Sequence, residues 1–191
     1  MMDDPNGMAA KNNLVVLFFL SLDSMFYNMF GIAYDDLLRI AIFFMDEETL
    51  KVAATVAGEA SAYSSREQRA IANVIVNRYY DPYNYFSNSS LLAVISEPGQ
   101  FGYEKNSEYF NALNNYKNGG FDYKGAFMSC LRQTAYVLYG LAGDNTGGAV
   151  FFNYTRNGND ANPYPAKLER ITGLSTSWHH NNFYRWKAGA W

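Results

Sequence analysis

Cysteine and histidine are nearly absent from this chain, which has one cysteine and two histidines in 191 residues. Because Cys130 is alone, the chain can form neither an intrachain disulfide nor a thiolate metal cluster. His179 and His180 are adjacent, so they point in different directions and cannot form the i, i+4 pair of a helical zinc site. We therefore predict that the chain binds no metal, and that Cys130 is a small buried core residue.

The chain also lacks an excess of positive charge, since 15 basic residues face 18 acidic ones for a net charge of −3. The basic surface that nucleic-acid binding requires is therefore missing. No phosphate-binding loop of the GxxxxGK[ST] type occurs, and Gly143, Gly147 and Gly148 precede a strand-like run rather than a helix. We predict no nucleic-acid partner and no cofactor.

Long uninterrupted apolar runs are absent as well. Residues 14–22 and 25–34 are strongly apolar, but acidic residues interrupt them before the roughly 18 residues that a membrane span needs. Asp3 and Asp4 are the opposite of the positive start of a secretory signal, so we predict neither a signal peptide nor an integral membrane span. We interpret residues 1–45 as an apolar helical extension that packs as core helices or, alternatively, docks a delivery partner.

The rest of the chain, residues 46–191, has the size of one domain with a substantial core. Hydrophobic residues make up 49% of the chain, and aromatic ones are abundant, with 16 tyrosines and 14 phenylalanines. Apolar periodicity predicts helices, and a β-like run predicts one strand. The predicted helices cover 50–57, 65–78, 91–96 (short, or a turn), 106–116 and 127–141, and the predicted strand covers 149–154. The expected fold is mainly α (α+β) with a small β element.

The stretch from Leu50 to Arg78 contains two glutamates in different settings. Glu67 ends a Ser64-Ser65-Arg66-Glu67 capping pattern, which predicts a helix start near Ser65 and gives this glutamate a structural role. Glu59 follows an apolar helix and Gly58, and no structural pattern accounts for it. Desolvation and the negative end of its own helix would raise the pKa of Glu59, as a general acid requires.

Several motifs in this chain resemble those of the SleB-type cell-wall hydrolases, which cleave peptidoglycan in spore cortex and related walls. Gly58-Glu59-Ala60, Gln68 and Asn77-Arg78 match that family's spacing without a gap. Further matches follow in the same order along the chain: Pro98-Gly99-Gln100-Phe101, then 148–153, and a closing segment at 180–185 that contains one additional residue after His180.

The resemblance implies a lysozyme-like helical fold that cleaves the bond between N-acetylmuramic acid and N-acetylglucosamine, with Glu59 as catalytic acid. We predict five substrate-binding residues: Gln100, Phe101, Tyr63, Gln68 and Tyr154. Turn formation and core packing explain Gln100, Phe101 and Tyr154 equally well. Gln68 could instead brace Glu59, and Asn77 and Arg78 could tie their helix end to a neighbouring loop, which we favour over contact with substrate.

One departure from the family bears on mechanism. Many members have a second glutamate four residues after the first, and here that residue is Tyr63. A lytic transglycosylase can use one carboxylate, because the muramoyl 6-hydroxyl attacks internally, whereas a hydrolase needs a group that positions water. The sequence therefore mildly favours the lytic transglycosylase over the muramidase. Glu104 and Asp160 are candidate second acids, but we interpret both as surface residues.

The alternative function is a non-catalytic module that binds the cell wall or delivers another protein. An antibacterial toxin or a phage lysis protein is compatible with catalysis, and a toxin would have an inhibitor (immunity) protein as partner. The expected partner is the peptidoglycan glycan strand. The expected location is the target's cell envelope or periplasm, or the extracellular space, reached without a classical signal peptide.

Overall fold

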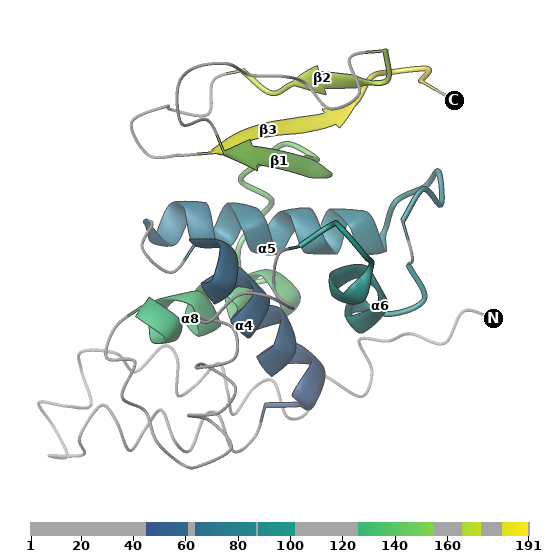
Figure 1. The fold of residues 1–191 in the computed structure, drawn as a ribbon. Coiled ribbons are helices and arrows are strands. Elements are labelled where there is room, and N and C mark those ends of the chain that lie inside the picture. The colour runs from purple at the N-terminus through teal and green to yellow at the C-terminus, as the bar shows by residue number, and fades with distance from the viewer. Residues whose placement is uncertain are drawn as a thin grey trace, which may run out of the picture. The chain divides into compact units, whose positions relative to one another are not determined.

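The computed structural model describes six stretches of the chain (Figure 1): 45–60, 64–86, 88–101, 126–154, 166–172 and 181–190. The chain divides into two compact units, Met1–Glu47 and Glu48–Trp191. Almost all of the first unit lies outside the described residues, and so do the predicted helices at 14–45 and 106–116. The fold below is therefore that of the second unit.

Four described helices confirm the helices predicted in these ranges: α4 (Glu47–Ala60), α5 (Ser65–Tyr79), α6 (Leu91–Ser96) and α8 (Ala126–Leu138). Three ends differ from the prediction by three residues each. Helix α4 begins at Glu47 and continues through Gly58 to Ala60, and α8 stops before Leu141. The early end of α8 has a local cause, because Gly140 has a φ of 69° and this left-handed conformation ends a helix. None of the described helices combines the length and apolar character needed to cross a membrane.

The caps of two helices are visible in the hydrogen bonds. The Ser64 hydroxyl accepts a hydrogen bond from the backbone N–H of Glu67 (3.3 Å), which confirms the hydroxyl half of the predicted capping pattern. In the same way the Ser90 hydroxyl accepts from the N–H of Ala93 (3.0 Å) at the start of α6. These local signals explain why both helices begin where the sequence predicts.

A three-stranded antiparallel sheet is formed by β1 (Phe151–Tyr154), β2 (Leu168–Arg170) and β3 (Asn181–Trp186), in the order β1-β3-β2. The sequence predicts β1 but not its two partners. In the register, Phe151 lies opposite Tyr184, and Leu168 lies opposite Trp186. The mainly helical α+β class is confirmed, with a small sheet as its β element.

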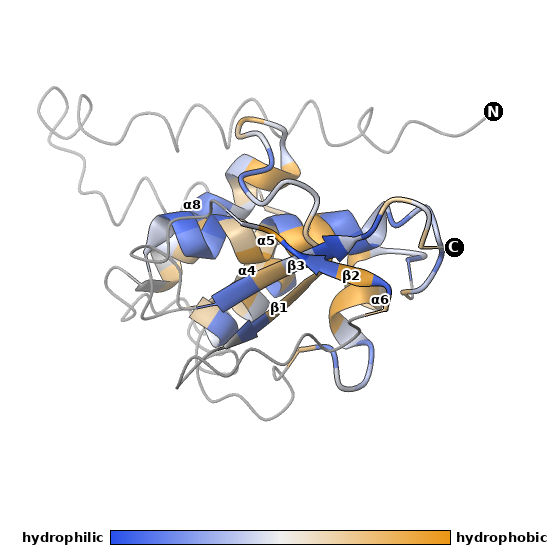
Figure 2. Cartoon of the chain, turned by 90° about the horizontal axis from the view of Figure 1, so that it is seen from above, coloured by the Kyte–Doolittle hydropathy of each residue, from blue (hydrophilic) through white to orange (hydrophobic). Residues whose placement is uncertain are grey.

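Helix α5 lies between the sheet and the other helices (Figure 1). Its Ala70 and Val74 pack against Ala149 and Phe183, which come from the sheet and the segment before it. A second cluster is aromatic and lies around Phe86, Phe151 and Tyr184. Figure 2 shows polar as well as apolar residues along α5. A helix enclosed in this way must also find partners for its polar side chains.

The polar face of α5 finds these partners in α8 and in the segment that follows it. Arg69 donates through Nε to Gln133 Oε1 (2.8 Å), and Asn73 donates through Nδ2 to Asn145 Oδ1 (3.0 Å). Both Asn73 and Gln133 are buried. Asn73 on the polar face of α5 is therefore inside the protein, whereas Arg66 at the start of the same helix is exposed.

Candidate functional site

Glu59 lies in the last turn of α4 and is half-buried, whereas Val56 and Ala60 on either side are buried completely or nearly so. The apolar run of α4 thus carries a carboxylate to the edge of the core. The placement agrees with the setting that the sequence predicts for Glu59, although its catalytic role stays a prediction.

Gln68 braces the helix end that carries Glu59. It is 1% exposed, its Nε2 donates to the carbonyl oxygen of Ala60 (3.3 Å), and its Oε1 accepts from Ser129 Oγ (2.6 Å). The amide therefore links α4, α5 and α8 at one point. This geometry favours the bracing role over the substrate-binding role that we also predicted for Gln68.

The end of α5 is tied to the segment before β1. Asn77 donates through Nδ2 to the carbonyl of Ala149 (2.9 Å), and Arg78 donates through Nε to the carbonyl of Val150 (2.6 Å). Both side chains thus serve the helix end, as predicted. Burial lowers the pKa of Arg78 to about 10, against the opposing attraction of Glu97 and then Glu59. Arg78 is therefore a buried cation at neutral pH.

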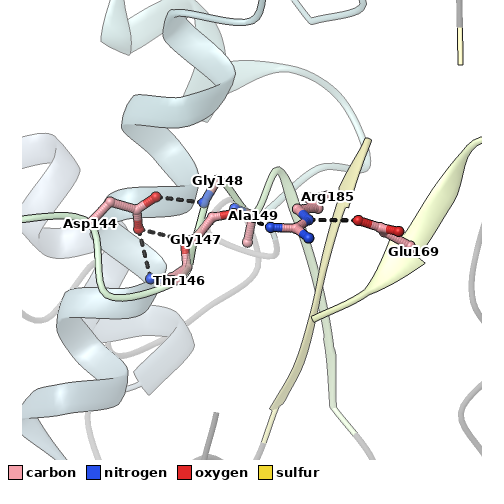
Figure 3. Close-up of polar contacts among 7 residues, drawn as sticks. All are labelled: Asp144, Thr146, Gly147, Gly148, Ala149, Glu169 and Arg185. Carbon is pink, nitrogen blue, oxygen red and sulfur yellow. Dashed lines mark hydrogen bonds and ion pairs between the residues drawn. The ribbon is translucent and has the colours of Figure 1, made fainter. Parts of the chain in front are cut away.

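The loop that receives Asn77 is organised by Asp144 (Figure 3). Its carboxylate accepts hydrogen bonds from the backbone N–H groups of Thr146 (2.7 Å) and Gly148 (2.7 Å) and from the Thr146 hydroxyl (2.6 Å). Gly147 and Gly148 have φ of 66° and 86°, which favours glycine at both positions. This loop sets the direction in which the chain enters β1.

The turn at Pro98-Gly99-Gln100-Phe101 begins at Glu97, whose carbonyl accepts a hydrogen bond from the N–H of Gln100 (3.2 Å). Gly99 has a φ of 78°. Phe101 is only 7% exposed, and its ring lies 4.6 Å from the Arg78 guanidinium carbon. Gln100 is partly exposed. Of these two predicted substrate residues, Gln100 is the one the structure leaves open to solvent, while Phe101 packs inside.

Other predicted site residues lie outside the described part of the chain: Tyr63, the side chain of Tyr154, the candidate acids Glu104 and Asp160, and both histidines. The backbone of Tyr154 pairs with that of Asn181 in the sheet. Within the described ranges, no group of three or more His, Cys, Asp or Glu side chains could hold a metal ion.

Glu67 has a contact that the sequence did not predict. It is fully buried, and its Oε1 accepts hydrogen bonds from Asn181. No local pattern in the sequence signals this distant partner of Glu67.

A comparison with protein-family models matches residues 63–177, more than half of the chain, to a family described as Cell Wall Hydrolase. The chain belongs to the cell wall hydrolase family. This finding confirms the resemblance to SleB-type hydrolases, and it supports hydrolysis of peptidoglycan in general. No curated protein and no solved structure matches the chain.

The family match includes the turn before Phe101. It also includes Gln68, which holds the end of α4, and Asn77 and Arg78, which hold the end of α5. It begins at Tyr63, so Gly58-Glu59-Ala60 lies just before the matched region. The role of Glu59 in this cell wall hydrolase therefore depends on its position in the structure and on the motif itself.

Proposed function

We propose that the protein cleaves the glycan strands of peptidoglycan between N-acetylmuramic acid and N-acetylglucosamine, with Glu59 as general acid. The observation that carries the proposal is the placement of Glu59: a half-buried carboxylate in the last turn of α4, next to Ala60, whose carbonyl Gln68 holds. A general acid must be held in a fixed place near the leaving oxygen, and bracing by a buried amide provides that.

In the first step the Glu59 carboxyl donates its proton to the glycosidic oxygen while the bond from that oxygen to the muramoyl anomeric carbon breaks. Positive charge develops at that carbon in an oxocarbenium-like transition state. The negative charge left on Glu59 then lies near the positive centre and stabilises it. Gln100, which is partly exposed, would offer its amide to the acetamido groups of the sugars.

The test is the Glu59→Gln variant on purified peptidoglycan sacculi. It preserves size and hydrogen bonding but removes the acidic proton, so fragment release should fall by about 100-fold or more. Glu47→Gln is the matched control, because Glu47 is an exposed glutamate in the first turn of the same helix. Glu47→Gln should retain wild-type activity, and full lysis by Glu59→Gln would overturn the assignment.

The same assay separates the catalytic proposal from the alternative of a non-catalytic wall-binding module. Such a module would bind sacculi without releasing fragments, and neither variant would then change its behaviour. The toxin or lysis role, its inhibitor and its delivery partner are compatible with this proposal but are not needed for it.

A further inference from the structure

Two tyrosines in the loop after α5 expose their rings to solvent. Tyr83 and Tyr85 are each 37% exposed. Both rings lie edge-to-face against the indole of Trp186, the last residue of β3, with centroid distances of 6.0 Å and 5.3 Å. We call these three residues the aromatic platform, because they place neighbouring rings together although they come from distant parts of the sequence.

Buried rings support the platform from inside. The indole of Trp186 lies 6.3 Å from the ring of Phe86 and 5.8 Å from that of Phe151, and both phenylalanines are buried. These buried rings already supply the apolar contacts of this cluster. The exposure of Tyr83 and Tyr85 is therefore not explained by core packing alone.

One buried carboxylate holds the platform in place. Asp81 is 2% exposed, and its Oδ1 accepts a hydrogen bond from the Trp186 Nε1–H (3.0 Å). The same carboxylate accepts from the backbone N–H groups of Tyr85 (2.9 Å) and Tyr83 (3.4 Å). The backbone carbonyl of Asp81 accepts from the N–H of Asn84 (3.2 Å), which closes a turn. The rings are thus ordered before any partner arrives, so less conformational entropy is lost on binding.

The loop that carries the two tyrosines is polar but uncharged. Residues 82–96 contain no Asp, Glu, Lys or Arg. Beside the tyrosines, Asn88 donates through Nδ2 to Asn84 Oδ1 (3.0 Å), and this amide pair is exposed. Flat rings next to amides suit a neutral sugar, because the C–H face of a pyranose packs on a ring while its hydroxyl and acetamido groups form hydrogen bonds. An anionic partner would instead need basic side chains.

The platform lies at the other end of α5 from the residue that braces α4. Gln68, which holds the residue after Glu59, is near the start of α5, and the platform loop follows Tyr79 at its end. At a rise of about 1.5 Å per residue, Gln68 and Tyr79 are about 16 Å apart along the helix axis. The platform is therefore separate from the proposed acid.

We propose that the aromatic platform is an accessory binding surface for the glycan strand of peptidoglycan, apart from the bond that is cleaved. Two observations identify this occupant. The chain belongs to a cell wall hydrolase family, so its substrate is a polymer many sugars long, and the platform offers ordered rings and amides without charge. Binding here keeps the protein on the strand between cleavage events. The inference goes beyond the cleavage assigned to Glu59, because retention of a strand needs no acid.

The first test measures binding to glycan strands from which an amidase has removed the stem peptides. Replacing both exposed tyrosines, in the double variant Tyr83→Ala/Tyr85→Ala, should weaken binding by about 10-fold or more. Tyr80→Ala is the matched control, since Tyr80 is 63% exposed in the same segment but its ring packs on Tyr79. Wild-type affinity in the folded double variant, or an equal loss in Tyr80→Ala, would overturn the proposal.

Cleavage kinetics separate the platform from the catalytic site. In the double variant, KM for long strands should rise more than KM for a short fragment, because only a long strand can contact both places. An equal rise for both substrates would place the tyrosines at the cleavage site and overturn the accessory role. A wild-type protein that binds strands but releases no fragments would overturn the proposed function and support the platform, so the two failures are distinguishable.

Asp81→Asn tests whether the rings must be held. The variant preserves size but replaces one acceptor oxygen by an amide group, which cannot accept the hydrogen bonds of the loop and the indole. Binding should weaken by about 3–10-fold although no ring is removed, and unchanged affinity would overturn the role of Asp81. Circular dichroism checks the fold of each variant. Wild-type binding to vesicles of phosphatidylethanolamine and phosphatidylglycerol, but not to glycan strands, would overturn the proposal in favour of a membrane surface.

Discussion

Glu67 and Asn181 lie 114 positions apart, yet Glu67 Oε1 accepts two hydrogen bonds from Asn181, one from its backbone N–H (3.0 Å) and one from Nδ2 (2.8 Å). Glu67 is fully buried. The first turn of the central helix thus holds the start of β3, the middle strand of the sheet. This contact joins the helical part of the domain to its β element.

Glu67→Ala should be strongly destabilising. It leaves two buried donors of Asn181 without their acceptor, which costs about 3 kcal/mol in the free energy of unfolding. Glu67→Gln should cost less, because its amide still offers one acceptor oxygen. Denaturant unfolding of both variants measures the difference, and equal stability of Glu67→Ala and the wild type would contradict the structural role.

Asn77→Ala should lower stability by about 1–2 kcal/mol, because it removes the hydrogen bond to the Ala149 carbonyl (2.9 Å). Asn77→Asp should cost more, since the new carboxylate would face both that carbonyl and the Asp144 carboxylate. Asn88→Ala is the control, because its hydrogen bond to Asn84 is exposed. If Asn77→Asp proves as stable as Asn77→Ala, the tie to the 144–149 loop is not energetically important.

Gln68→Met should reduce activity as well as stability. It removes the hydrogen bonds to Ala60 and Ser129 at similar volume, so the end of α4 is less well held and kcat should fall about 10-fold. Gln133→Met is a matched control, because Gln133 is also buried and hydrogen-bonded but contacts Arg69. If kcat falls equally in both variants, the loss comes from removing any buried amide and not from loosening the end of α4.

Cys130 should be unreactive in the folded protein. Its side chain is fully buried, and desolvation raises the pKa of the thiol to about 12 from 9.0. A thiol-disulfide reagent at pH 8 should therefore label it only after unfolding. Because the folded pKa is raised, stability from this group is complete below pH 9.0 and is lost as pH rises toward about 12. Rapid labelling of the native protein would contradict this burial.

Arg185→Ala should have little effect on stability. Its ion pair with Glu169 (2.7 Å) joins side chains that are 49% and 43% exposed, and its bond to the Gly147 carbonyl is long at 3.4 Å (Figure 3). Exposed pairs of this kind contribute about 0–1 kcal/mol. Thermal unfolding at low and high salt measures it, and a large loss would mean that this pair organises the loop before β1.

The helices of this domain were predictable because their signals are local. The hydroxyl cap at Ser64 and the apolar face containing Ala70 and Val74 can be read within one helix, and the structure confirms them. Strand β3 gave no such signal, because Asn181 to Tyr184 are all buried and the alternation of a half-buried strand is missing. Its asparagines also disfavour a strand by propensity.

The sequence by itself determined the helical frame, the buried state of Cys130, the family motifs and the isolation of Glu59 at the end of an apolar helix. The tertiary structure alone decided that Glu67 binds the start of β3, and that Arg78 is buried among the rings of Phe86, Phe101 and Phe151. The physical reason is the distance along the sequence between interacting residues, because helix caps and apolar periodicity involve residues only a few positions apart. The partner of a buried charge or hydrogen bond is instead set by chain packing, which brings distant segments together.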